Sequence, residues 1–152
     1  MGRARDQNIQ FKENEKAYRG LIVVLQRVSE ASVEIEGKVS GEIDHGILIL
    51  LGIEEADEQE DIDWLVRKIV NLRIFNDEEG KMNLSCQDVG GDYLVISQFT
   101  LHASTKKGNR PSYIKAAKPD TAIPLYQRFI EALSKASGKN IQTGEFGAMM
   151  NV

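Results

Sequence analysis

Asp92-Tyr-Leu-Val-Ile-Ser-Gln-Phe-Thr-Leu101 is the stretch on which the fold and the candidate site of this chain depend. Its first half, Tyr93 to Ile96, is a β-branched and aromatic run behind a Gly-Gly turn, which predicts a buried strand. Its second half brings polar side chains to the end of that strand: Ser97, Gln98 and Thr100. Polar groups left unpaired in an interior cost a few kcal/mol each, so these side chains must find partners or face a cleft. We therefore expect a site at this rim of the sheet.

A segment rich in cations follows the strand. Residues 106–118 contain five basic residues and no acid: Lys106, Lys107, Arg110, Lys115 and Lys118. Hydroxyl groups beside positive charge indicate a site for an anionic or ester-bearing ligand. A charged run is as often only a solvated surface, and composition alone leaves both interpretations open.

Length and composition indicate one ordinary globular domain. A chain of 152 residues is long enough to bury a sizeable core. Its longest apolar run, residues 46–53, is far too short to cross a bilayer, and no export signal is apparent. The single cysteine, Cys86, excludes an internal disulfide and is typical of a reducing cytoplasm. Cys86 is either a packing residue or a nucleophile, and a net charge of −4 argues against non-specific nucleic-acid binding.

Periodicity divides the chain into an extension and one domain. Residues 1–20 are polar and charged without any hydrophobic period, so we predict a disordered or non-native extension there, and a single domain over residues 21–152. The expected strands span residues 21–28, 32–36, 39–43, 47–51, 72–75, 93–96, 141–143 and 149–152. Helices are expected from Asp57 to Asn71 and from the Pro119-Asp120-Thr121 segment, capped by Asp120 or Thr121, to Gly138. This order predicts an α+β fold with a mixed or antiparallel β-sheet and two main helices.

The chain lacks a conventional catalytic base near the expected rim. Ser97 and His102 are five positions apart, so they point to opposite faces unless the strand breaks between them. No Gly-x-Ser-x-Gly elbow surrounds Ser97, and no glycine-rich phosphate loop is present. The two histidines and the cysteine lack metal-ligand spacing, which makes a zinc site unexpected.

An ester can be hydrolysed without such a base. Main-chain N–H groups at the strand end, together with Gln98, can stabilise a developing oxyanion, and such donors contribute roughly 3–4 kcal/mol each. Thr100 or Ser97 can orient the attacking water or a substrate hydroxyl. In the alternative interpretation, Ser97 and Thr100 only cap main-chain groups where the strand ends.

Four segments far apart in the chain form a more specific signal than any one of them alone. They are Gln26-Arg27-Val28-Ser29-Glu30-Ala31-Ser32-Val33, Ser97-Gln98-Phe99-Thr100-Leu101, Lys107-Gly108-Asn109-Arg110-Pro111-Ser112 and Thr143-Gly144-Glu145-Phe146-Gly147-Ala148-Met149-Met150. In this order and spacing they closely resemble the D-aminoacyl-tRNA deacylase (D-tyrosyl-tRNA deacylase) family, from about Leu21 to Val152.

The resemblance implies a cytoplasmic homodimer of α+β subunits with a barrel-like sheet. Such an enzyme hydrolyses the ester between a D-amino acid, or glycine mischarged on tRNA(Ala), and the tRNA 3′ end. This reaction releases free amino acid and tRNA, which is a chiral proofreading step in translation. The resemblance implies aminoacyl-tRNA as the partner, with no metal, organic cofactor, membrane or other protein partner.

The same resemblance implies roles for individual residues. Ser97, Gln98 and Thr100 would be catalytic, and Phe99 would place its main chain near the aminoacyl group. The remaining implied roles are a pocket wall of Phe146 and Met150, a brace at Arg27, and tRNA contacts at Lys106, Lys107 and Arg110. Two mechanisms remain open: Thr100 as nucleophile, or hydrolysis assisted by the 2′-hydroxyl of the terminal adenosine. The lack of a histidine base favours the second.

One feature departs from the family pattern. Family members continue into a last strand with a Gly-Pro that reaches into the partner subunit's pocket and excludes L-amino acids. This sequence contains no Gly-Pro dipeptide, and we expect a domain truncated at its C-terminus. Two alternatives to an active deacylase follow: a catalytically impaired tRNA-binding relative, or an assembly module that pairs through an uncovered sheet edge.

Overall fold

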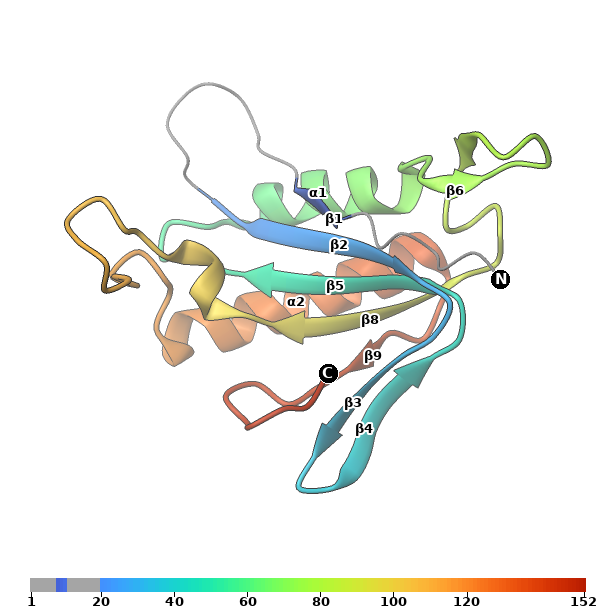
Figure 1. Cartoon of the computed structure of the whole chain (residues 1–152). Helices are drawn as coiled ribbons and strands as arrows, with labels where there is room; N and C mark the ends of the chain where they lie inside the picture. Colours follow the sequence, from blue (N-terminus) through green and yellow to red (C-terminus); the bar gives the residue numbers. More distant parts are fainter. Residues whose placement is uncertain (1–7, 11–19) are drawn as a thin grey trace.

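Five strands form one mixed β-sheet in the order β1–β2–β5–β8–β9, and two helices cover one of its faces (Figure 1). The computed structural model describes residues 8–10, in their main chain, and residues 20–152. The strands are β1 (Asn8–Gln10), β2 (Ile22–Val28), β3 (Ala31–Ile35), β4 (Lys38–Ile43), β5 (Gly46–Gly52), β6 (Phe75–Asn76), β7 (Met82–Leu84), β8 (Asp92–Ser97) and β9 (Gln142–Thr143). The helices are α1 (Gln59–Asn71) and α2 (Pro119–Ser137), with a short 3₁₀ helix, η1 (Phe99–His102), after β8.

The centre of the sheet is the parallel pair β5 and β8. Ile47 lies opposite Tyr93, and Leu51 lies opposite Ser97, so the two strands end at the same edge. On its other side β5 pairs antiparallel with β2, and β8 pairs in parallel with β9. A strand of this kind is covered on both faces, which explains why β5 and most of β8 are continuous apolar runs.

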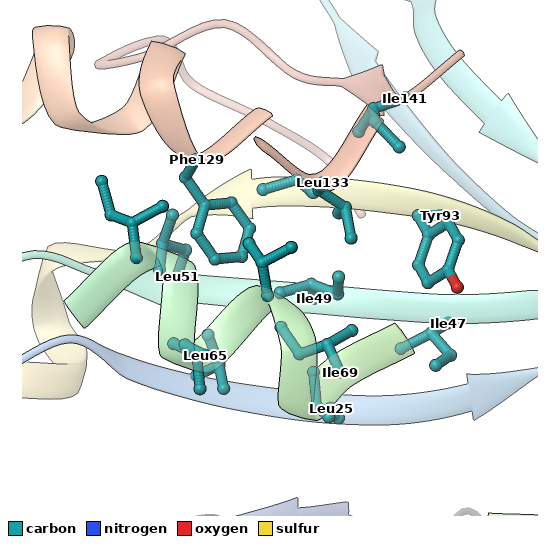
Figure 2. Close-up of a cluster of buried hydrophobic side chains, with 14 of the residues drawn as sticks. Leu25, Ile47, Ile49, Leu51, Leu65, Ile69, Tyr93, Phe129, Leu133 and Ile141 are labelled. Atoms are coloured by element: carbon teal, nitrogen blue, oxygen red, sulfur yellow. The ribbon is translucent and has the colours of Figure 1, made fainter. Parts of the chain in front are cut away.

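The core lies mainly between the sheet and the two helices. Figure 2 shows side chains of β2, β5 and β8 packed against both helices, namely Leu25, Ile47, Ile49, Leu51 and Tyr93 against Leu65, Ile69, Phe129 and Leu133. One face of α1 is buried against the sheet as an apolar stripe of Ile62, Leu65, Val66, Ile69 and Val70. Burial of these side chains fixes the position of β8, and therefore of the rim at its end.

The β3–β4 hairpin packs on the opposite face of the sheet. Val33 and Ile43 of the hairpin are buried against Leu94 and Ile96 of β8. Its two-residue turn is Glu36-Gly37, with φ angles of 51° and 75°, the geometry that suits the twist of a tight hairpin. The predicted hairpin and the α+β class with a mixed sheet and two main helices are thus confirmed.

Several predicted boundaries are wrong. The first helix begins at Gln59 and not at Asp57, whose carboxylate instead accepts the main-chain N–H of Glu54 at 2.6 Å. Lys118, and not Asp120 or Thr121, is the N-cap of α2, because Pro119 with its fixed φ takes the first helical position. The strand expected over residues 72–75 is Phe75–Asn76, and residues 149–152 contribute a single bridge between Asn151 and Glu34.

Part of the predicted extension is described. Asn8–Gln10 pairs antiparallel with residues 24–26 of β2, so the main chain of these three residues forms a strand. Residues 1–7 and 11–19 of the predicted extension lie outside the described residues. Whether residues 1–20 are non-native stays a prediction. Within the described ranges, no helix is long and apolar enough to cross a membrane, and the cytoplasmic location also stays a prediction.

Candidate active site

The chain leaves the sheet sharply at the end of β8. Gln98 N–H donates to the Leu51 carbonyl at 2.7 Å, and η1 begins at the next residue. The adjacent Gly52 allows this turn, since a Cβ at that position would lie 3.0 Å from Leu101 Cβ and 3.2 Å from the Gln98 carbonyl oxygen. Close packing of η1 on the end of β5 therefore favours glycine at this position, and it places residues 97–100 at the rim.

A cavity of about 360 Å³ opens at this rim. Its lining comes from the ends of β5 and β8, the start of α2 and the C-terminal residues. It comprises Leu51, Ile53, Ile96, Ser97, Gln98, Phe99, Ala117, Ala122, Phe146, Gly147, Ala148, Met149, Met150 and Val152. The structure thus brings together five of the predicted site residues, Ser97, Gln98, Phe99, Phe146 and Met150, from two segments about fifty residues apart.

Thr100 lies behind the lining and is linked to it through Gln98. The Gln98 side-chain amide donates a short hydrogen bond to Thr100 Oγ1. Thr100 is half-buried and does not itself line the cavity. Its hydroxyl oxygen is therefore occupied as an acceptor, and among the described residues no titratable side chain is hydrogen-bonded to it.

The strand breaks between Ser97 and His102, so the two side chains are not held on opposite faces of one strand. β8 ends at Ser97, and His102 closes η1. His102 is 9% exposed, its Nε2 has no hydrogen-bond partner among the described residues, and it does not line the cavity. His45 lies at the start of β5, at the other end of that strand, where Nε2 is 2.9 Å from the Val89 carbonyl oxygen. Neither histidine is therefore positioned as a base for Ser97 or Thr100.

The predicted aromatic residues of the site have partners that the sequence analysis missed. The Phe99 ring is 57% exposed and meets Tyr113 edge-to-face with centroids 5.3 Å apart. Phe146 packs against Tyr126 of α2 at 5.9 Å. Both partners come from the segment between η1 and the end of α2, and no local pattern indicates that they meet the strand-end residues.

The predicted brace, Arg27, lies away from the cavity. Its Nη1 donates to the Ile74 carbonyl at 2.6 Å and lies 3.4 Å from Asn76 Oδ1. On the sheet it pairs with Ile47, four residues before Leu51. Contact between Arg27 and the cavity wall is not seen among the described residues.

The basic segment forms the loop between η1 and α2. Lys106, Lys107 and Arg110 are exposed, and none of them lines the cavity. The loop is closed by paired main-chain hydrogen bonds of 2.8 Å between Ser104 and Ser112. In Figure 1 it projects beyond the end of β8, on the side where the chain leaves the sheet.

Two further titratable groups clarify the chemistry. Burial raises the pKa of the Cys86 thiol to about 11, so the thiol stays protonated and acts as a packing residue. Burial also raises the pKa of Asp57, just beyond the cavity residue Ile53, to about 6. Among the described residues, no cluster of three potential metal ligands is present.

Comparisons with known proteins identify the family of this chain. A family model described as D-Tyr-tRNA(Tyr) deacylase matches residues 24–152. Proteins named D-aminoacyl-tRNA deacylase from Flavobacterium johnsoniae and Bacteroides thetaiotaomicron are 65% and 68% identical over 130 residues, which is 86% of this chain and 87% of each relative.

Solved structures show the same fold. A structure titled c-Myc DNA Unwinding Element Binding Protein has a TM-score of 0.79 at 41% identity, covering 85% of this chain and 87% of that one. A structure titled as a probable eukaryotic D-amino acid tRNA deacylase has a TM-score of 0.75 at 16% identity, covering 88% and 92%, and shows the fold alone. By the match over residues 24–152 and the identity to its relatives, the chain belongs to the D-Tyr-tRNA(Tyr) deacylase family.

Proposed function

We propose that this protein hydrolyses the ester bond of D-aminoacyl-tRNA and releases the free D-amino acid and tRNA. The observation that carries this proposal is the cavity at the end of β8, where Ser97, Gln98 and Phe99 meet Phe146 and Met150 in a chain of this family. The relatives named D-aminoacyl-tRNA deacylase support the same activity. The alternative of an impaired tRNA-binding relative is not favoured.

Main-chain donors at the rim are suited to the transition state of ester hydrolysis. Among the described residues, the main-chain N–H groups of Phe99 and Thr100 donate no hydrogen bond. The Gln98 N–H, by contrast, donates to the Leu51 carbonyl. Water attack on an ester places negative charge on the carbonyl oxygen, and fixed N–H donors stabilise that charge. In our proposal the ester carbonyl lies beside Phe99, with Ser97 orienting the water or the ribose.

We further propose that the substrate itself assists the attack. Thr100 Oγ1 accepts a hydrogen bond from Gln98, and no described base is bonded to Thr100, which argues against an activated nucleophile. The 2′-hydroxyl next to the ester is the nearest group of the substrate that can pass a proton between the water and the leaving oxygen. Thr100 then acts by holding the Gln98 amide at the cavity wall.

The tRNA body is proposed to contact the basic loop. Lys106, Lys107 and Arg110 are exposed on a loop that projects from the end of the sheet that carries the cavity. Phosphate contacts of this kind give affinity that falls as salt rises.

We also propose that two copies of the chain associate around the cavity. Large apolar side chains of its lining are exposed, namely Phe99 at 57%, Met149 at 92% and Val152 at 62%. An exposed apolar surface of this kind favours association. Sedimentation equilibrium of the chain tests this; a monomer at micromolar concentration would refute it.

The activity is tested by the release of tyrosine from D-tyrosyl-tRNA, with L-tyrosyl-tRNA and glycyl-tRNA measured alongside. D-Tyrosyl-tRNA that ends in 2′-deoxyadenosine separates the two mechanisms, because substrate assistance predicts loss of turnover, whereas a Thr100 nucleophile predicts that turnover remains. Ser97→Ala and Thr100→Ala are expected to slow hydrolysis, and the control Thr105→Ala, on the exposed loop, is expected to have no effect. Salt-sensitive tRNA binding without hydrolysis would refute the proposed enzyme.

A further inference from the structure

The cavity wall that faces β8 is a short segment with its own supports. Residues 144–150 leave β9, supply Phe146 and Met150 to the lining, and continue to Asn151. Asn151 is tied to Glu34 of β3 by two main-chain hydrogen bonds of 2.7 and 2.8 Å. At the other end, Gly144 N–H donates to the Val95 carbonyl at 3.4 Å. The wall is thus attached at both ends, to β8 and to the hairpin.

Because Gly144 has no side chain, the side chain of Met150 can occupy the space beside it. A Cβ at Gly144 would overlap Met150 Sδ and would lie 3.3 Å from Ile96 Cδ1. The φ angle of Gly144 is not in the left-handed region, so the backbone itself accepts another residue. The glycine is therefore required by the position of the Met150 side chain and not by the turn.

The side chain that a Cβ at Gly144 would displace belongs to the cavity lining. Met150 lines the cavity and Gly144 does not. A side chain added at Gly144 therefore moves the flexible thioether of Met150 and alters the cavity wall. Such a change reshapes this wall while leaving the rim at Ser97, Gln98 and Phe99 untouched.

Tyr126 supports the second wall residue. Its hydroxyl donates to the same Val95 carbonyl at 3.1 Å, and its ring packs on Phe146 at a tilt of 58°. Burial raises the pKa of Tyr126 to about 12, so the hydroxyl remains a donor at physiological pH. Tyr126 is buried and does not line the cavity, so it acts on the substrate only through Phe146.

We propose that Gly144 and Tyr126 are positioning residues that set the width of the substrate cavity, Gly144 through Met150 and Tyr126 through Phe146. This inference rests on the proposed function, in that the cavity is taken to hold the aminoacyl end of the tRNA. Because neither residue touches the reacting atoms, changes at both affect substrate binding and leave the chemical step intact.

The test compares kcat and KM of the full chain for D-tyrosyl-tRNA. Gly144→Ala is expected to raise KM about tenfold with kcat nearly unchanged, since loss of fit by about one methylene has effects of this order. Tyr126→Phe is expected to raise KM about threefold, because it keeps the ring and removes one hydrogen bond. Restoring space with Gly144→Ala/Met150→Ala is expected to return KM to that of Met150→Ala alone, which a merely destabilising change would not do.

Matched controls exist for both variants. A Cβ at Gly91 would also lie too close to a sulfur atom, at 2.7 Å from Cys86 Sγ, but Gly91 does not line the cavity. Gly91→Ala therefore reports the effect of crowding in the core without a change at the cavity wall. Tyr93 is buried on β8, beside Cys86 and away from the cavity, so Tyr93→Phe controls for loss of a buried hydroxyl.

Binding of a non-hydrolysable D-tyrosyl-3′-aminoadenosine, measured by calorimetry, separates this inference from the proposed function. Weaker binding to Gly144→Ala with unchanged binding to Gly91→Ala supports the positioning role. Equal KM and Kd in wild type and Gly144→Ala, or failure of the Met150→Ala rescue, would overturn it. If the wild-type chain binds the analogue but does not hydrolyse D-tyrosyl-tRNA, the proposed function is refuted. The inference about cavity width is then decided by the Kd values of wild type and Gly144→Ala alone.

Discussion

Replacing Asp57 with asparagine is expected to make the protein more stable at neutral pH. Asp57 is 8% exposed at the junction of β5 and α1, and its Oδ2 accepts the Glu54 main-chain N–H at 2.6 Å. Burial, followed by the nearby charges of Asp61 and Glu54, outweighs this hydrogen bond and raises the Asp57 pKa from 3.8 to about 6. Asparagine keeps an oxygen acceptor for Glu54 and removes the buried charge.

The sign and size follow from linkage between protonation and folding. Because the folded pKa lies above the unfolded one, folding favours the protonated carboxyl, and stability is lost as pH rises from about 4 to about 6. A pKa difference of about 2 corresponds to a loss of about 3 kcal/mol, which persists at pH 7. Asp57→Asn lacks this titration. We therefore expect its free energy of unfolding, relative to that of wild type, to rise by up to about 3 kcal/mol between about pH 4 and pH 7.

The assay is urea unfolding of wild type and variant across this range, with the free energy of unfolding extrapolated to water. Asp88→Asn is the control, because hydrogen bonds from the Ser85 N–H and hydroxyl lower the Asp88 pKa, and its carboxylate is ionised in both states above about pH 5. Its effect should therefore be constant between pH 5 and 7. Equal pH slopes for wild type and Asp57→Asn would refute the reasoning.

Three further outcomes are expected. Replacing Lys106, Lys107 and Arg110 together with alanine should raise KM for aminoacyl-tRNA and leave kcat unchanged. It should also lower the slope of log KM against log salt concentration by about 3. An unchanged slope would show that the basic loop does not contact the tRNA. Gly46→Ala should lower the free energy of unfolding by about 3 kcal/mol or more, because a Cβ there overlaps the Asp92 carbonyl oxygen, and a loss under 1 kcal/mol in urea unfolding would contradict this. Iodoacetamide should label Cys86 only in denaturant, because the thiol is buried and its pKa is about 11, and alkylation of the native protein detected by mass spectrometry would show otherwise.

The elements that the sequence predicts well are those whose environment is the same along their whole length. β5 and most of β8 are apolar at successive positions because both faces are buried, and the stripe of α1 follows one face against the sheet. The change from Ile96 to Ser97 marks the end of β8 because the chain leaves the core at that residue. Three of the predicted site residues, Ser97, Gln98 and Phe99, line the cavity for this reason.

Local patterns fail where one residue serves a distant partner. Lys118 is an unusual cap, and its main-chain N–H is held by Glu55 at 2.8 Å, across 63 positions of sequence. The resemblance implies that Arg27 braces the cavity wall, yet its guanidinium donates to the Ile74 carbonyl. None of these partners is recognisable from spacing alone.

One half of the site is predicted from the residues of one strand, whereas the other half, at Phe146 and Met150, is predicted only through the family resemblance. The rim at Ser97 is a property of one strand, whereas the wall at Phe146 and Met150 exists only because β9 pairs beside β8. The pairing of β9 with β8 is only two residues long. Tyr126, Gly144 and the bridge at Asn151 hold the segment that follows β9 in place. Fit to the substrate therefore depends on supports that neither contain reactive groups nor touch the ligand, and changes at those supports should alter binding before they alter chemistry.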